Sequence, residues 1–265
     1  MTKREHCQTL LENAAEKGIC LAFSGGTDSS LLLRLAKDAA EKKGTPLCAV
    51  TFDTVLHPAC DLEVASKVAR ELGVSHHVIH IDELQNPALA MNPPDRCYLC
   101  KKTLFEKLLA FAKENGFGAV LEGTNEDDLH VYRPGLRAIR ELGILSPLAE
   151  SGLTKAEVRQ WAKELGISVA SRPASPCLAT RLPYGDRIDL ELLGRIGRCE
   201  DALRAKGLRN VRVRVHGNIL RLEADKEAFE KILQEREAFL EELKQVGTPY
   251  ITLDLEGFRS GSMDL

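Results

Sequence analysis

The stretch of sequence that decides the fold reads Ala22-Phe23-Ser24-Gly25-Gly26-Thr27-Asp28-Ser29-Ser30. An apolar run at residues 19–23 precedes the glycines, and a leucine-rich segment at 31–35 follows them. This order predicts a buried strand, a turn of small residues and the start of a helix. Glycines allow close approach of a ligand, and the helix N-terminus adds unpaired amides and the positive end of its dipole. The stretch therefore predicts an anion-binding site.

Side chains of the same stretch can add ligands of their own. Ser24, Thr27, Ser29 and Ser30 carry hydroxyls that can donate to phosphate oxygens. Asp28 can hold Mg²⁺ on a phosphate. The pattern is neither the lysine-containing P-loop nor the three-glycine dinucleotide fingerprint. A serine–glycine turn before an ordinary helix is the alternative, but the strand–turn–helix context with Asp28 favours a nucleotide.

Length and composition are those of a globular protein. The chain has 265 residues, 44% of them hydrophobic and 28% charged, which is enough for one large domain or a medium domain with a small one. The net charge of −3 gives no sign of a nucleic-acid partner or an anionic membrane. The charged N-terminus lacks the apolar core of a signal peptide, and no apolar run approaches the ~20 residues of a membrane span. We therefore expect a cytoplasmic protein.

Helical and strand-like segments alternate over most of the chain. Helices are expected at residues 29–43, 61–72, 101–115 and 154–165, and strands at 19–23, 46–53, 77–81 and 119–128. This alternation predicts an α/β fold with a Rossmann-like parallel sheet. Ligands of such sheets bind beyond the carboxyl ends of the strands. Thr51 and Asp53 end one strand, so we expect them near the adenine or ribose.

The C-terminal part has a different pattern. Residues 168–187 hold three prolines and little periodicity, which indicates an active-site loop and a joint between domains. A helix at 189–206, a hairpin at 211–223, a helix at 225–245 and a strand at 250–255 then form a small α+β unit. We expect a nucleotide domain at residues 1–170 and a smaller α+β domain for the substrate at 171–265.

The chain contains eight cysteines. Disulfides are rare in cytoplasmic proteins, so these cysteines argue against a disulfide framework. Five fall on strand-like or helical patterns and are expected to be structural: Cys7, Cys20, Cys48, Cys60 and Cys199. The other three are Cys97 and Cys100, in a Cys-x-x-Cys pair, and Cys177, in the proline-rich loop. These three are candidates for thiol, metal or cluster chemistry.

The segment SGGTDSS resembles the SGGxDS loop of the PP-loop ATP pyrophosphatases, which have the adenine nucleotide alpha hydrolase-like fold. The resemblance implies that Ser24, Gly25, Gly26, Thr27, Asp28 and Ser29 bind ATP, with Asp28 on Mg²⁺, and that AMP is transferred to an acceptor. Gly123, Thr124 and Asn125 resemble the second phosphate-side motif. Arg133 follows them and can face a phosphate, whereas Asp127 and Asp128 suit either a metal or a capped turn.

Further segments narrow the resemblance: DRCYLCKK, EGTNEDD, RPGLRA, SRPASPCLATRLPYGDRI, VRVRVH and DLEGFRSGSMDL. Together they resemble the LarE-like ATP-dependent sulfur transferases over essentially the whole chain. The resemblance implies adenylation of pyridinium-3,5-biscarboxylic acid mononucleotide, followed by formation of a thiocarboxylate for the nickel-pincer cofactor. It also implies a homo-oligomer, with nickel inserted by another protein.

The source of sulfur has two interpretations within this family. Cys177 can act as a sacrificial donor, its thiolate favoured by nearby Arg172, Arg181 and Arg187. Alternatively, Cys97, Cys100 and Cys177 hold a [4Fe–4S] cluster with one open iron, as resemblance to three-cysteine members implies. A redox or zinc Cys-x-x-Cys pair is the remaining alternative, although no histidine stands nearby as a further zinc ligand.

Arg212 and Arg214 alternate along one expected strand. Their ordinary interpretation is a solvated face. The family resemblance suggests that they grip the substrate phosphate together with Thr180 and Arg181. Two other functions remain open: a [4Fe–4S]-dependent tRNA-thiolating PP-loop enzyme and a nucleotide sensor without catalysis. The mild acidity and the lack of a dense Lys/Arg tract argue against a tRNA partner.

Overall fold

The computed structural model describes residues 1–57, 59–172, 176–259 and 262–263. The chain divides into two compact units. Unit 1 comprises Met1–Thr54, Ala59–Glu83 and Asp95–Ser175. Unit 2 comprises Val55–Pro58, Leu84–Pro94 and Pro176–Leu265. Two short segments from the first hundred residues therefore join the C-terminal unit, which no local sequence pattern indicates.

Unit 1 is built on a parallel four-stranded sheet with the order β3-β2-β1-β4. Its strands are β1 (Ile19–Ala22), β2 (Leu47–Thr54), β3 (Ser75–Ile81) and β4 (Ala119–Leu121). A parallel bridge between Leu121 and Leu145 continues the sheet beyond β4. The predicted Rossmann-like sheet is confirmed, and its carboxyl edge carries the loop after β1.

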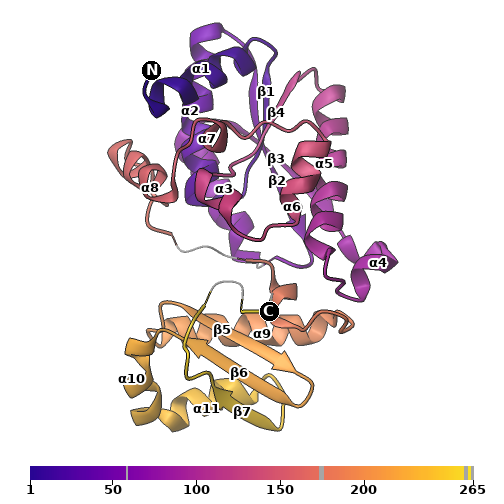
Figure 1. Ribbon diagram of the computed structural model, residues 1–265, viewed down its shortest axis with the longest axis vertical. Coiled ribbons are helices and arrows are strands. Elements are labelled where there is room, and N and C mark those ends of the chain that lie inside the picture. The colour runs from indigo at the N-terminus through magenta and orange to yellow at the C-terminus, as the bar shows by residue number, and fades with distance from the viewer. Residues whose placement is uncertain (58, 173–175, 260–261, 264–265) are drawn as a thin grey trace. The chain divides into compact units, whose positions relative to one another are not determined.

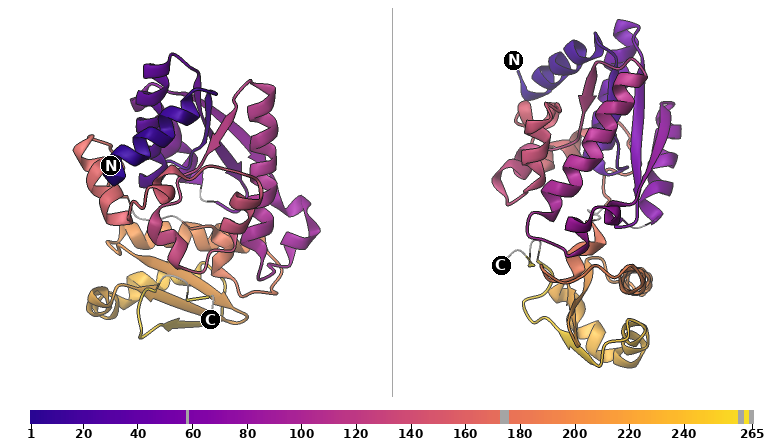
Figure 2. Two further views of the ribbon diagram at one scale, coloured as in Figure 1. Left: turned by 45° about the horizontal axis from the view of Figure 1, so that its top comes forward. Right: turned by 90° about the vertical axis from the view of Figure 1, so that its right-hand side faces the viewer.

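Helices cover both faces of this sheet (Figure 1). They are α1 (Lys3–Ala15), α2 (Thr27–Lys43), α3 (Ala59–Leu72), α5 (Arg96–Glu114), α6 (Gly135–Glu141), α7 (Pro147–Glu150) and α8 (Lys155–Glu164), with the 3-10 turn η2 (Glu126–His130). In Figure 1 and in the left view of Figure 2, indigo α1 and magenta α5 lie on opposite sides of the strands. Unit 1 is thus a three-layered α/β sandwich.

Alternation along β1 divides the core of unit 1 into two layers, because successive strand side chains point to opposite faces. Ile19 and Leu21 pack in one layer, which also holds Trp161. Cys20 and Cys48 pack in the other layer, beside α5. The expectation that these two cysteines are small buried hydrophobes is confirmed.

Unit 2 contains a mixed three-stranded sheet with the order β5-β6-β7. Its strands are β5 (Val211–His216), β6 (Ile219–Ala224) and β7 (Tyr250–Leu253). β5 and β6 form the expected antiparallel hairpin, and β7 pairs with β6 in parallel. The helices are α4 (Pro87–Ala90), α9 (Leu190–Ala205), α10 (Phe229–Gln234) and α11 (Arg236–Lys244), with 3-10 turns η1 (Glu83–Gln85, beginning in unit 1), η3 (Leu178–Arg181) and η4 (Lys226–Ala228).

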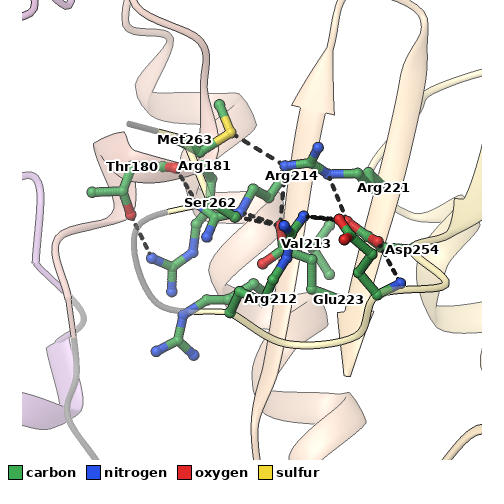
Figure 3. Close-up of polar contacts among 12 residues, drawn as sticks. Thr180, Arg181, Arg212, Val213, Arg214, Arg221, Glu223, Asp254, Ser262 and Met263 are labelled. Atoms are coloured by element: carbon green, nitrogen blue, oxygen red, sulfur yellow. Dashed lines mark hydrogen bonds and ion pairs between the residues drawn. The ribbon is translucent and has the colours of Figure 1, made fainter. Parts of the chain in front are cut away.

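The two faces of β5 have different environments. Val211, Val213 and Val215 pack into an apolar core with side chains such as Ile196 and Phe239. The alternate residues, Arg212 and Arg214, lie on the other face and are also buried (Figure 3). The interpretation of these arginines as a solvated face is therefore wrong, because residues outside the strand cover them.

Two expected elements have other bounds in the structure. α5 begins at Arg96 and not at residue 101, so Cys97 and Cys100 lie on a helix and not in a loop. The helix expected at 225–245 is broken at Glu235, whose φ of −98° and ψ of 26° separate α10 from α11. The sequence around Glu235 has neither glycine nor proline to signal the break.

In the part of the chain that the structure describes, no helix combines the length and the apolar character that crossing a membrane requires.

Candidate functional site

The loop between β1 and α2 has a backbone that requires glycine. Gly25 has a φ of 67°. A Cβ atom at Gly25 would lie 2.8 Å from the backbone N and Cα of Ala65 on α3, closer than real Cβ atoms come. Gly26 is the N-cap residue of α2, so no side chain stands between the helix N-terminus and a ligand. The predicted anion-binding geometry is thus built by local backbone and by packing against α3.

The hydroxyls of the loop divide into two groups. The Oγ atoms of Ser24 and Ser29 lie 3.1 Å apart within the loop, and Ser29 Oγ also donates to the carbonyl of Gly26 at 3.2 Å. Thr27 Oγ1 instead donates to the carbonyl of Val169 at 2.9 Å. The hydroxyls of Ser24 and Ser29 therefore stay within the loop, whereas the Thr27 hydroxyl ties the loop to the segment after α8.

Asp28 lies in the first turn of α2, and its two carboxylate oxygens have different surroundings. Oδ2 accepts a hydrogen bond from Lys155 Nζ, at the start of α8. Oδ1 is buried and has no hydrogen-bond partner among the described residues. A buried oxygen of this kind costs free energy unless a ligand satisfies it. Carboxylate oxygens are hard ligands, so this atom fits Mg²⁺.

Lys155 is a site residue that the sequence analysis did not single out. Its backbone N–H donates to Asp127 Oδ2 at 2.9 Å, and its side chain contacts Asp28. The capping box of Thr154 and Glu157 sets the start of α8 and puts Lys155 at the first helical position. A lysine there faces the positive end of the helix dipole, which is unfavourable without a nearby anion. A lysine at this unfavourable position was the feature of the sequence that could have identified Lys155 as a site residue.

The second phosphate-side motif approaches the loop from β4. A Cβ atom at Gly123 would lie 3.0 Å from the backbone N of Ser29, so glycine permits close contact between the two segments. The backbone N–H of Thr124 donates to Glu122 Oε1 at 3.0 Å. Burial raises the pKa of Glu122, but the charge of Lys101 and several hydrogen bonds outweigh burial and lower it. Glu122 is therefore an ionised carboxylate beneath the motif.

The polar turn after the motif is capped. Asn125 and Asp128 form a reciprocal capping box around η2. Asp128 Oδ1 also forms an ion pair with Arg133 Nη2 at 2.9 Å. Burial raises the pKa of Asp128, with Arg133 opposing and Asp28 reinforcing the shift. The structure thus gives Asp128 the structural role that the sequence analysis left open, and it places Arg133 on Asp128.

Thr51 and Asp53 both lie near the end of β2, but they face different surroundings. Thr51 Oγ1 is buried and donates to the carbonyl of Phe23 at 2.6 Å, which braces the strand that leads into the loop. His76 Nε2 lies 2.8 Å from the same hydroxyl, and burial lowers the pKa of His76. Asp53 Oδ2 pairs with His80 Nδ1 at 2.8 Å on the surface. Thr51 therefore supports the loop from below.

Cys97 and Cys100 lie one turn apart at the start of α5, in unit 1, and are partly exposed. The spacing of three residues puts both thiols on one side of the helix. Arg96 Nη2 lies 3.6 Å from Cys97 Sγ. Cys177 belongs to unit 2, where it is the N-cap residue of η3. Among the described residues of each unit, no three His, Cys, Asp or Glu side chains gather as a metal site.

The turn after Cys177 is held by buried charge. Thr180 Oγ1 donates to the Cys177 carbonyl at 2.8 Å. Arg181 Nη1 donates to Thr180 Oγ1 at 2.8 Å and to the Cys177 carbonyl at 3.3 Å. The same guanidinium pairs with both carboxylate oxygens of Glu200, each at 2.8 Å. Arg181 thus fixes the backbone that carries Cys177.

Arg214 connects this turn to the sheet of unit 2. Its Nη1 donates to the carbonyl of Thr180 at 2.6 Å, and its Nε donates to Glu223 Oε1 at 2.8 Å (Figure 3). Arg221 and Ser262 donate to the same oxygen of Glu223, at 3.0 and 2.6 Å. Glu223 Oε2 is buried without a hydrogen-bond partner among the described residues. The predicted residues Thr180, Arg181 and Arg214 therefore lie together.

Arg212 completes the buried arginine face. Its guanidinium donates to the Val211 carbonyl at 2.7 Å and lies 5.1 Å from the centre of the Phe258 ring. The pKa of Arg212 is lowered to about 10, mainly by burial. Repulsion from Arg181 lowers it further, and this effect is larger than the opposing effect of Glu200. The Arg212 guanidinium is thus buried within reach of the charge of Arg181. The sequence analysis missed Glu200 and Glu223. Only their positions opposite the arginines in the fold mark these two carboxylates.

Comparison with known proteins agrees with this geometry. Residues 1–128 match the PP-loop domain family. Pyridinium-3,5-bisthiocarboxylic acid mononucleotide synthase of Lactiplantibacillus plantarum is 35% identical over 246 residues, which cover 93% of this chain and 88% of that protein. The chain belongs to the LarE-like family of PP-loop enzymes. An uncharacterized protein of Synechocystis sp. is 40% identical over 92% of this chain and 91% of its own length.

As a LarE-like PP-loop enzyme, the chain is an ATP-dependent sulfur-transferring enzyme. The tRNA-specific 2-thiouridylase MnmA of Brucella suis is only 28% identical, over 64% of this chain and 52% of that protein. The similarity to the LarE-like relatives extends through unit 2, whereas the similarity to the tRNA enzyme covers much less of either chain. The LarE-like assignment therefore accounts for both units.

Proposed function

We propose that this enzyme adenylates a carboxylate of pyridinium-3,5-biscarboxylic acid mononucleotide and converts it to a thiocarboxylate for a nickel-pincer cofactor. The observation that carries the proposal is the identity of 35% over 93% of the chain to a relative named for the bisthiocarboxylic product. The anion loop of unit 1 and the arginine face of unit 2 supply the two kinds of binding that the reaction needs. One holds ATP and the other holds an anionic substrate.

The first half-reaction uses unit 1. A substrate carboxylate oxygen forms a bond to the α-phosphorus of ATP. The bond between that phosphorus and the bridging oxygen of pyrophosphate breaks, and pyrophosphate leaves with the electron pair. Gly25, Gly26 and the N-terminus of α2 hold the leaving group, with Ser24 and Ser29 adding hydroxyl donors. Asp28 would hold Mg²⁺, which when bound polarises the phosphate oxygens.

The arginine face of unit 2 is proposed to bind the phosphate of the substrate nucleotide. Arg181, Arg212 and Arg214 are buried beside Glu200 and Glu223. Burial and, to a lesser extent, the charge of Arg181 lower the pKa of Arg212, and a bound anion would stabilise its cation. Glu223 Oε2, buried without a partner among the described residues, can accept a hydrogen bond from a donor of the same ligand.

The second half-reaction places sulfur on the acyl adenylate. A sulfur nucleophile forms a bond to the acyl carbon, and AMP leaves with the electron pair of the broken C–O bond. In the sacrificial route Cys177 Sγ is that nucleophile. Loss of its Cα proton with cleavage of the Cβ–S bond then releases the thiocarboxylate and leaves dehydroalanine. η3 holds the Cys177 backbone for this attack through Thr180 and Arg181.

We propose the alternative route, with a [4Fe–4S] cluster held by Cys97, Cys100 and Cys177, as the one this chain uses. The support is chemical: two partly exposed thiols on one side of α5, and a third at the turn that the arginines brace. With three protein ligands, such a cluster would leave one iron open to hydrosulfide. Unit 1 then corresponds to the nucleotide domain and unit 2 to the substrate domain. A cytoplasmic homo-oligomer that passes its product to a nickel-inserting protein completes the proposal.

The test is anaerobic incubation of the full chain with Mg·ATP, hydrosulfide and the biscarboxylic mononucleotide. The proposal predicts AMP, pyrophosphate and a product whose mass reports replacement of oxygen by sulfur. Iron and acid-labile sulfide are measured on the same preparation and on a Cys97→Ala/Cys100→Ala variant, with Cys199→Ala as the matched control. About four irons per chain, lost only in the double variant, identify the cluster route. Loss of H₂S from Cys177 without iron identifies the sacrificial route, and no sulfur-containing product with this acid refutes the proposed substrate.

A further inference from the structure

We propose that Lys155 is an exchangeable internal cation of the phosphate site. Lys155 pairs with Asp28 in the structure, and we infer that on ATP binding it moves to the pyrophosphate end of the nucleotide. This inference rests on the proposed function, because it takes ATP with Mg²⁺ as the ligand of the anion loop. It adds a phosphate-binding residue from α8 to a site otherwise built by β1, α2 and β4.

Two contacts hold Lys155 beside the loop in different ways. The backbone N–H donates to Asp127 Oδ2 at 2.9 Å, which anchors the main chain. The ammonium group contacts Asp28 Oδ2 through a flexible four-carbon stem. The side chains of Lys155 and Asp28 are 32% and 21% exposed, so this ion pair is partly open to solvent. The anchor fixes where the stem begins, and the ammonium group can still move.

The helix dipole makes the lysine dependent on an anion. Lys155 occupies the first position of α8, where positive charge is disfavoured by a few tenths of a kcal/mol or more. Thr154 and Glu157 cap this end of the helix, so the start of α8 is well defined. Asp28 is the carboxylate that the ammonium group contacts in the structure. A triphosphate at the loop offers a larger negative charge to the same ammonium group.

Asp28 has reason to exchange its partner. Oδ1 remains buried without a hydrogen bond among the described residues while Oδ2 faces Lys155. An ammonium group cannot satisfy both oxygens in this geometry, and a metal ion beside it would repel it. When ATP binds with its Mg²⁺, Lys155 therefore leaves Asp28. Asp28 lies in the first turn of α2, so the ammonium group of Lys155 is already close to the N-terminus of that helix. Phosphates bound there are therefore the next anions that it can contact.

The chemical role of Lys155 is to stabilise the leaving group. As the bond between the α-phosphorus and the bridging oxygen breaks, the electron pair stays on that oxygen and negative charge develops there. Lys155 remains protonated throughout and lies against this charge, so no proton is transferred to or from it. Fixed positive charge at a developing oxyanion lowers the barrier of such displacements.

The experiment uses the full chain without any acid substrate, and two probes. Mn²⁺ alone is titrated and followed by electron paramagnetic resonance, and Mg·pyrophosphate is titrated by calorimetry. For Lys155→Met we expect Mn²⁺ to bind about threefold more tightly, the effect of removing a partly exposed competing ion pair. We expect Mg·pyrophosphate to bind at least about tenfold more weakly, because a hydrogen bond to a charged group is lost.

Three further variants make the result specific. Lys163→Met removes an exposed lysine from the other end of α8 and should change neither affinity. Lys155→Arg keeps the charge and should recover part of the pyrophosphate affinity. Asp28→Asn should lose Mn²⁺ binding. Thermal unfolding of each variant checks that the fold is retained.

The inference fails in either of two ways. Unchanged Mn²⁺ affinity in Lys155→Met means that the lysine does not compete for Asp28. Unchanged pyrophosphate affinity means that the lysine stays on Asp28 when the phosphates bind. Neither titration contains an acid substrate, so both results are independent of whether the chain thiolates the biscarboxylic mononucleotide.

Discussion

Arg181 and Glu200 form a bidentate ion pair inside unit 2, with side chains that are 2% and 1% exposed. Glu200 also accepts hydrogen bonds from Arg204 and from the backbone N–H of Val213. One carboxylate thus joins η3, α9 and β5. Because Cys177 is the N-cap residue of η3, the position of the proposed sulfur nucleophile depends on a charge pair that solvent does not reach.

Breaking this pair from one side should be costly. We expect Arg181→Met or Glu200→Met to lower the free energy of unfolding by about 3–5 kcal/mol, because each leaves a buried charge without its bidentate partner. The double variant should lose less than the sum of the two single losses. Urea denaturation with unit 2 probes measures this, and additive losses would contradict a direct coupling between the two side chains.

Gly25→Ala should abolish ATP binding, and Gly44→Ala is its matched control. Gly25 and Gly44 have nearly the same φ, 67° and 66°. A Cβ at Gly25 meets the backbone of Ala65 at 2.8 Å, whereas a Cβ at Gly44 meets nothing within 4 Å. Both variants should lose about 1 kcal/mol or more of stability from the left-handed backbone. Equal ATP affinities in the two variants would show that close packing of the loop is not required.

Arg212→Met should stabilise the protein while weakening substrate binding. Burial and repulsion from Arg181 disfavour the Arg212 cation, so an apolar side chain should raise the free energy of unfolding by about 1 kcal/mol. Phosphate, compared with chloride at equal ionic strength, should raise the Tm of the wild type but not of the variant. Arg236→Met, at a site where the arginine is 68% exposed, is the control. A destabilised Arg212→Met would mean that the cation is already compensated.

His216 should make the protein less stable in mild acid. Burial lowers its pKa, and Arg221 and Arg214 lower it further against the weaker opposing effects of Glu223 and Asp186. Between the folded pKa and the ordinary value of about 6.5, the unfolded chain binds a proton that the folded chain does not. Stability is therefore lost as the pH falls through about 6.5. His216→Gln should reduce this slope and leave the stability at about pH 8 nearly unchanged.

Cys177→Ala should stop sulfur transfer and spare adenylation. Cys177 lies in unit 2, and the anion loop lies in unit 1, so pyrophosphate release from ATP and the acid should continue in the variant. Product analysis by mass spectrometry, with a parallel pyrophosphate assay, separates the two half-reactions. Loss of both would instead assign Cys177 a role in holding η3.

Local features of the site were predictable from the sequence. The anion loop depends on neighbours in the chain: an apolar strand, two glycines and the first turn of α2. The capping box at Thr154 and Glu157 is equally local. The alternation of β5 correctly placed Arg212 and Arg214 on one face, because strand periodicity does not depend on what covers the strand.

Features that depend on distant segments were not predictable. Phe258 lies against Arg212, and Ser262 donates to Glu223, so the tail helps to bury a face whose residues alone indicate a solvated surface. Lys155 and Asp28 meet across 127 residues of chain. Charged side chains carry no sequence signal that distinguishes a solvated face from a covered one. The break at Glu235 lies within a run of good helix formers and also had no local signal.

β5 has consequences for how unit 2 reaches its native pairing. A slip of one residue against β6 would exchange the faces of the strand, driving Arg212 and Arg214 into the layer of Ile196 and Phe239 and turning Val213 toward Glu223. Both halves of that exchange are unfavourable, since it buries charge in an apolar layer and leaves carboxylates without cations. The valine side of β5 therefore fixes the register, and with it the positions of the guanidinium groups of Arg212 and Arg214. The apolar core on one side of β5 thus keeps in register the arginines on its other side, which we propose bind an anion.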